Sequence, residues 1–221
     1  MTESELKEKA KQLEEKFLPL SGITALYKHP ALGADITKLE IGYASADRES
    51  KIEIKIRCKE FREYIVIIDV EKKIIINDLI IGHPDFKGAF LACFNSQVEH
   101  AIANNYKKIT LVAHYQDEPY NYEVAGRDDE GIIWNGHVVW GKYGFQMKET
   151  QRIKTFVPSM QAHEKTEDYI HELYLETDNA SAAKEVWNDL GLSWGGVFDL
   201  GDNSLSHQIL RGLNGKYAKL S

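Results

Sequence analysis

The sequence predicts an α/β (α+β) protein: a mixed, mainly antiparallel central sheet with helices on both faces and a helical C-terminal extension. Four runs rich in β-branched residues follow one another with connections of hairpin length, which indicates an antiparallel meander. The period then becomes helical and returns to a strand, so a strand–loop–helix–strand unit follows the meander. The expected strands are 36–44, 51–58, 63–70, 74–81 and 109–113, and the helix is 89–105.

The segments on either side of this block complete the expected organisation. An amphipathic helix is predicted over 2–20, because Thr2 and Glu5 form a capping-box pair before a helical apolar pattern. Further expected elements are an irregular span at 114–130, a short helix at 135–143, an extended stretch at 145–154 and helices at 166–176 and 181–190. We therefore expect an N-terminal segment (1–35), a core (36–154) and a C-terminal extension packed on it (155–221).

Composition restricts the classes of function. Hydrophobic residues make up 43% of the 221 residues, which is enough for a substantial core. A net charge of −7 argues against a nucleic-acid surface as the main function. Cys58 and Cys93 belong to no CxxC or Cys/His cluster, so they are expected to be small buried hydrophobes, and no metal site is predicted. No signal-like N-terminus and no long apolar run occur, which favours a cytoplasmic protein that does not enter a membrane.

The break between the fourth strand and the long helix is the first candidate site. Residues Gly82 to Gly88 place two glycines around a proline directly before the helix. A helix that begins after such a turn directs several backbone N–H groups at one spot, where its dipole also favours an anion. A phosphate group is the expected ligand, although many strand–loop–helix units bind nothing.

The order of elements and the residues of this loop resemble the GNAT superfamily of acyl-CoA-dependent N-acetyltransferases. That family has Gln/Arg-x-x-Gly-x-Gly/Ala after its fourth strand, and the backbone there holds the pyrophosphate of acetyl-CoA. Gly88 matches the pattern, whereas Asp85 and Phe90 depart from it. The resemblance implies acetyl-CoA as cofactor, held by Ile80, Ile81, Gly82, Phe86, Lys87, Gly88 and Ala89.

A second motif, at 135–145, is similar to a divergent GNAT-like group with an Asn-Gly-x-x-x-Trp-x-x-x-Gly-Phe stretch. The resemblance adds Asn135 and Trp140 to the cofactor-binding residues. In ordinary members a Tyr at the aligned position acts as general acid to the CoA thiolate, and Trp140 cannot donate a proton in that way. Tyr143, three residues later, is the candidate acid, and packing as a buried aromatic is the commoner fate of such a residue.

If the family chemistry holds, the reaction is transfer of an acetyl group to a primary amine, and a carboxylate serves as base. Asp78 is the best-placed candidate and Asp69 the second, although either side chain could be a strand carboxylate facing solvent. The expected function is N-acetylation of an unknown small-molecule or protein amine. The alternative is a catalytically inactive protein of the same fold that acts as a binding or interaction module.

Overall fold

The computed structural model describes residues 3–27, 36–44, 50–83, 88–113, 136–147 and 194–217. The chain divides into two compact units, 1–111 and 112–221. The predicted helices at 166–176 and 181–190 and the end of the extended stretch at 145–154 lie outside the described residues.

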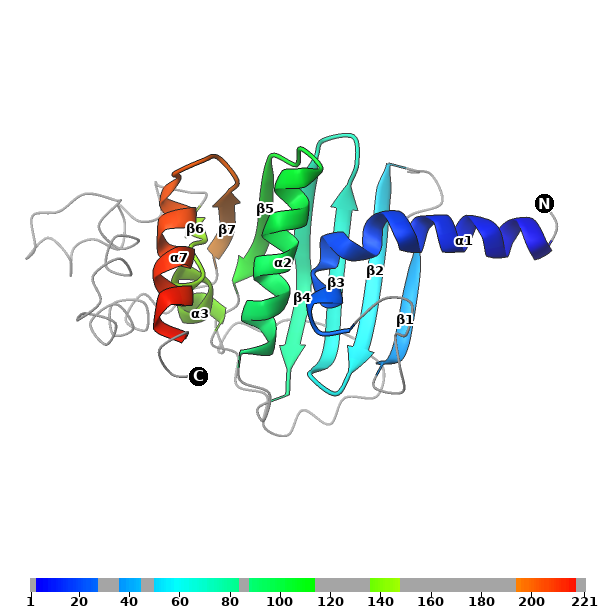
Figure 1. The fold of residues 1–221 in the computed structure, drawn as a ribbon, viewed down its shortest axis with the longest axis horizontal. Coiled ribbons are helices and arrows are strands. Elements are labelled where there is room, and N and C mark those ends of the chain that lie inside the picture. Colours follow the sequence, from blue (N-terminus) through cyan, green and yellow to red (C-terminus); the bar gives the residue numbers. More distant parts are fainter. Residues whose placement is uncertain are drawn as a thin grey trace, which may run out of the picture. The chain divides into compact units, whose positions relative to one another are not determined.

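The first unit contains the meander and the crossover helix. Its elements are α1 (Glu3–Phe17), the 3-10 helices η1 (Leu18–Ser21) and η2 (Ile23–Ala25), β1 (Ile36–Tyr43), β2 (Lys51–Cys58), β3 (Phe61–Asp69), β4 (Ile74–Gly82), α2 (Ala89–Ala103) and the start of β5 (Lys108–Ala113) (Figure 1). Strands β1 to β4 are antiparallel neighbours in chain order, and β5 joins β4 in parallel. The prediction of a mixed, mainly antiparallel sheet is therefore confirmed.

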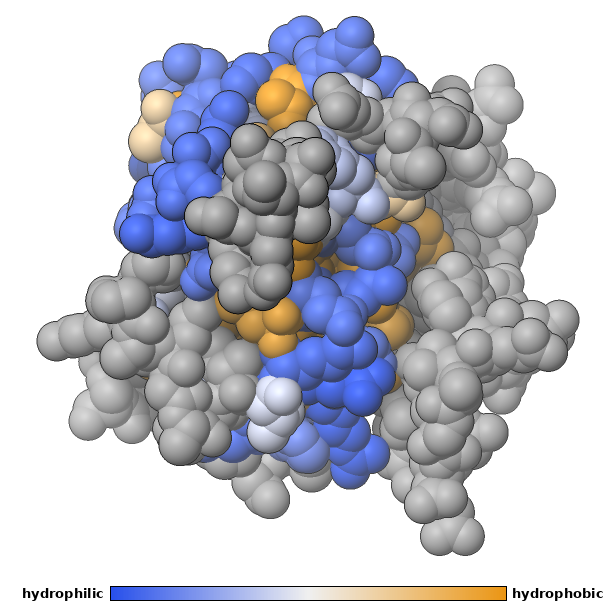
Figure 2. Space-filling model, turned by 90° about the vertical axis from the view of Figure 1, so that its right-hand side faces the viewer, coloured by the Kyte–Doolittle hydropathy of each residue, from blue (hydrophilic) through white to orange (hydrophobic). Residues whose placement is uncertain are grey.

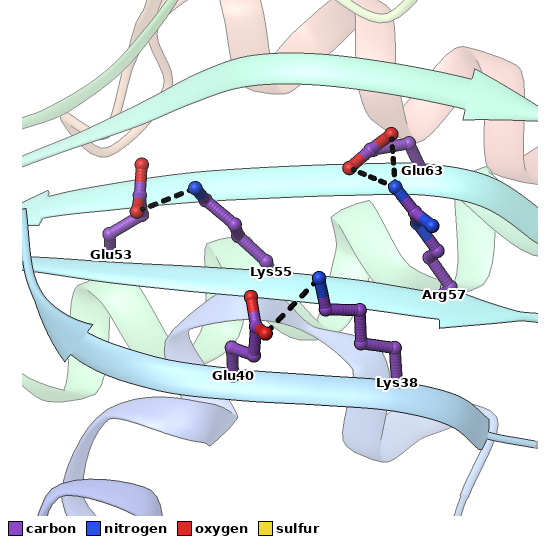
Figure 3. A network of polar contacts seen from close by, with 6 residues as sticks. All are labelled: Lys38, Glu40, Glu53, Lys55, Arg57 and Glu63. Atoms are coloured by element: carbon purple, nitrogen blue, oxygen red, sulfur yellow. Dashed lines mark hydrogen bonds and ion pairs between the residues drawn. The ribbon is translucent and has the colours of Figure 1, made fainter. Parts of the chain in front are cut away.

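Strand β2 has a buried and a charged face, as its alternating sequence predicts. Ile52, Ile54 and Ile56 are at most 1% exposed. The opposite face of β1, β2 and β3 carries ion pairs (Figure 3), namely Lys38–Glu40 at 3.1 Å, Lys55–Glu53 at 3.1 Å and Arg57–Glu63 at 3.3 Å. Such exposed pairs contribute little to stability. Burial of the isoleucine row is what holds this strand in the sheet.

Helix α2 covers the apolar face of the sheet (Figure 1). Phe94, Val98 and Ala101 are buried under it, as the helical period predicts. Ile102 was expected on the same face but is 42% exposed, because it lies at the border of the apolar stripe. Asn104 caps the end of the helix, and Asn105 follows with φ 57°, the left-handed conformation that Asn tolerates.

The second unit contains the end of β5 and two short helix–strand pairs. Its other described elements are α3 (Gly136–Lys142), β6 (Gln146–Met147), β7 (Trp194–Asp199) and α7 (Leu205–Tyr217). β6 and β7 pair antiparallel. The expectation of a helical C-terminal extension is thus wrong for 194–199, because Trp194, Gly196 and Phe198 alternate towards the interior as strand residues do.

Figure 2 shows the side of the molecule that carries β1 and α1. Most of the described surface there is hydrophilic, with small hydrophobic patches near the centre. None of the helices in the described ranges has the length and apolar character required to cross a membrane.

Candidate functional site

The geometry of β4 changes at Asp78. Val66 of β3 pairs with Asn77, but the next β3 residue, Ile65, pairs with Leu79. Asp78 is therefore an extra residue, a β-bulge that interrupts the ladder. Bulges bend a strand and redirect a side chain, and they are frequent next to active sites. The side chain of Asp78 is exposed.

The parallel pairing between β4 and β5 ends at the same point. The register joins Ile74 to Lys108 and ends with Asn77 opposite Leu111. Strand β4 continues to Gly82, so its last five residues, 78–82, lie beyond this pairing. In this part Ile80 is half-buried and pairs with Tyr64 of β3, whereas Ile81 is buried. The second half of β4 is thus held mainly from the β3 side.

Gly88 forms the start of α2. It adopts φ 90° as the N-cap residue, a conformation that favours glycine, and a Cβ atom there would meet nothing within 4 Å. Ala89 is the first residue of the 15-residue helix. The N–H groups of the first turn of any α-helix have no partner inside the helix, so this open position fits an anionic group such as a phosphate.

Phe90, which departs from the family pattern, packs into the core. Its ring stacks on Phe94 with 5.7 Å between centroids and meets Tyr64 edge-on at 6.4 Å. These contacts direct the ring towards β3, on the sheet side of α2. Asp85, Phe86 and Lys87 of the loop, and Asn135 of the second motif, lie outside the described residues.

The two candidate bases have different environments. Asp69 is 4% exposed, and its Oδ1 accepts a 2.8 Å hydrogen bond from the backbone N–H of Lys72. It closes the turn between β3 and β4, where its register partner is Ile74, at the start of β4. Asp69 is therefore a turn residue rather than a solvent-facing carboxylate. Asp78 does face solvent, and it lies at the bulge.

The second motif folds as an aromatic cluster in the second unit. The ring of Trp140 lies 5.9 Å from that of Tyr143 and 5.8 Å from that of Phe145. Trp140 and Tyr143 are both half-buried, and Tyr143 N–H donates to the carbonyl of Trp140 at 3.1 Å. Tyr143 thus contributes to packing in its own unit, while Asp78 and Gly88 belong to the first unit.

Sequence reasoning missed a buried polar cluster at the turn between β2 and β3. Glu60 is 8% exposed and accepts a hydrogen bond from the hydroxyl of Tyr27, which follows η2. Burial is the main cause that raises the pKa of Tyr27 above its usual value, followed by the bond to Glu60. No sequence pattern marks this pair, because the residues are 33 positions apart.

The two cysteines are free and buried, as predicted. Burial raises the pKa of both thiols, Cys58 and Cys93, above the usual range. A protonated, buried thiol is a poor nucleophile and a poor metal ligand. Across the described ranges, no group of three or more His, Cys, Asp or Glu side chains is placed to hold a metal ion.

Comparison with known proteins adds no relative. No protein-family model matches the chain, and neither a curated protein nor a solved structure matches it.

Proposed function

We propose that the protein is an acetyl-CoA-dependent N-acetyltransferase that acts on a primary amine in the cytoplasm. The observation that carries the proposal is the geometry of β4: the strand bulges at Asp78 where its pairing with β5 ends. Beyond that point the strand runs to Gly82, close in sequence to the glycine that begins α2.

These features suit the two ends of the proposed cofactor. The open backbone at Gly88 and the first turn of α2 would hold the pyrophosphate. The residues of β4 beyond Asn77 would receive the acyl end, and a backbone N–H near Ile80 or Ile81 would polarise the thioester carbonyl. Acetyl-CoA supplies the activated acyl group, and the chain supplies position, hydrogen-bond donors and a base.

Asp78 is the proposed base. The ammonium form of the acceptor must lose a proton before its nitrogen can attack the thioester carbon, and the exposed carboxylate of Asp78 can accept that proton directly or through one water. The C–N bond then forms, the C–S bond breaks, and the departing thiolate takes a proton. Tyr143 remains the proposed donor of that last proton.

A second candidate function is a binding module of the same fold without catalysis. The packing of Trp140 against Tyr143 and Phe145 favours it, because Trp140 occupies the position of the usual acid and Tyr143 has a structural role in the cluster. This module would use the same face of the molecule for protein contacts.

Thermal unfolding of the full chain with and without millimolar acetyl-CoA tests the proposal. Ligand at about 100 times its dissociation constant adds about 2.7 kcal/mol to the free energy of unfolding. For a chain of this size the melting temperature then rises by roughly 5–10 °C. Release of free CoA thiol in the presence of a panel of amines would separate the enzyme from a module that only binds. Absence of any shift would leave the non-catalytic module.

A further inference from the structure

The side chains of Asn77 on β4 and Gln97 on α2 form a closed amide pair. Asn77 Nδ2 donates to Gln97 Oε1 at 2.9 Å, and Gln97 Nε2 donates to Asn77 Oδ1 at 3.0 Å. Gln97 Nε2 also donates to the carbonyl of Leu20 in η1 at 3.0 Å. Asn77 is 3% exposed and Gln97 fully buried. Unpaired amides are unfavourable in such a dry interior, so the pair is a directional link between β4, α2 and η1.

The link lies at the point where β4 changes geometry. Asn77 is the last residue of β4 that pairs with β5, opposite Leu111, and it is also the last before the bulge residue Asp78. Any movement of Asn77 along the strand would therefore move the bulge with it.

Little else in β4 fixes its register. Asn77 and Asp78 stand between two aliphatic triplets, 74–76 and 79–81. A slip by one residue would largely exchange one aliphatic side chain for another, and a hydrophobic pattern of this kind specifies register weakly. The same slip would separate Asn77 from Gln97 and leave two amide groups unpaired in the core, which strongly disfavours it.

We infer that the Asn77–Gln97 pair fixes the register of β4 and so positions the bulge at Asp78 for acyl transfer. The inference rests on the proposed function for its catalytic part alone. Both residues are positioning residues: they lie under the strand, in contact with each other and with η1, and hold the backbone that would receive the acyl group. A single buried polar group is known to set register in other folds.

The test compares the full-length chain with a double variant, Asn77→Leu with Gln97→Met. This variant removes both amides together, so that no unpaired amide remains in the core. We expect it to fold but to show more than one set of cross-strand contacts between β3 and β4 in nuclear Overhauser spectra. We expect kcat to fall by about 100-fold, the effect of a misplacement of about 1 Å. The KM for acetyl-CoA should stay within about threefold, since the start of α2 is unchanged.

A matched control is Tyr64→Phe. It removes another buried hydrogen bond that links the sheet to η1, the one that the Tyr64 hydroxyl donates to the carbonyl of Ser21 at 2.6 Å. This variant should be less stable and should keep one register and the wild-type kcat. A single wild-type register in the double variant would overturn the inference.

If the double variant does not fold, Gln97→Glu provides the same test in a side chain of equal size. Its protonated acid can donate to Asn77 and accept from it, whereas the ionised form cannot donate. One register at acidic pH and several at alkaline pH would support the inference, and one register throughout would overturn it. The contacts between β3 and β4 are measured without acetyl-CoA. A wild-type chain that lacks turnover would therefore refute the proposed function and leave the register test intact.

Discussion

A Cβ atom at Gly22 would lie 1.8 Å from the carbonyl oxygen of Cys93. Gly22 joins η1 to η2 with φ 75°, and Cys93 belongs to the middle of α2. The backbone of the N-terminal segment therefore touches the backbone of the helix that covers the sheet. Only glycine combines this close approach with a left-handed conformation.

The first prediction concerns this contact. Gly22→Ala should lower the free energy of unfolding by about 3 kcal/mol or more, because the backbone of α2 must move to admit the methyl group. The matched control is Gly42→Ala on β1, where a Cβ would meet nothing within 4 Å. It should change stability by less than about 0.5 kcal/mol. Denaturant unfolding measures both values, and equal effects would contradict the contact.

The second prediction separates the two candidate bases. Asp78→Ala should lower kcat by about 10²- to 10⁴-fold, the usual contribution of a general base, with little change in stability. Asp69→Ala should have the opposite profile, since it loses the hydrogen bond to Lys72 N–H. Its free energy of unfolding should fall by about 1 kcal/mol with kcat unchanged. Steady-state kinetics beside denaturant titrations decide the matter, and an inactive but stable Asp69→Ala would reverse the assignment.

The third prediction concerns the start of α2. Gly88→Glu should abolish the increase in melting temperature caused by acetyl-CoA, because it places a carboxylate among the proposed phosphate donors. The variant is itself strained at φ 90°, so each shift is measured against the same variant without ligand. Gly212→Glu on α7 introduces the same charge where a Cβ meets nothing within 4 Å, and it should keep the shift. A full shift in Gly88→Glu would place the cofactor elsewhere.

The fourth prediction is a pH dependence from His207 on α7. Burial is the main cause that lowers the pKa of His207, and Arg211 adds to it, while Asp199, Asp202 and the backbone of Leu200 oppose it. Its ring lies 5.2 Å from that of Phe198, and Nε2 is buried without a hydrogen-bond partner in the described part of the chain. Folding therefore favours the neutral imidazole.

The sign of the effect follows from that preference. Below the unfolded pKa, about 6.5, the unfolded chain binds more protons at this histidine than the folded chain does. The stability that His207 contributes is complete above that pH and declines as the pH falls through the lower folded pKa. His207→Asn should lack this component, so its stability relative to wild type should rise between about pH 7.5 and pH 5. Parallel pH profiles of the two proteins would contradict the prediction.

Local sequence patterns determined the elements of the first unit. β-Branched alternation placed the predicted strand 51–58 at the bounds of β2, and the change of period placed the start of α2 at Ala89. Short connections were enough to predict antiparallel neighbours, since a tight turn can join strands in that way only. The buried thiols also followed from the sequence, because they belong to no reactive spacing.

Tertiary structure decided the rest, because the relevant contacts join residues distant in the chain. The bulge at Asp78 depends on the register between β3 and β4, and the near-uniform aliphatic sequence of β4 does not encode that register. The link between Asn77 and Gln97 spans 20 positions, and the bond from Tyr27 to Glu60 spans 33. The role of Asp69 as a turn residue likewise appears only in the folded chain, where its carboxylate meets the N–H of Lys72.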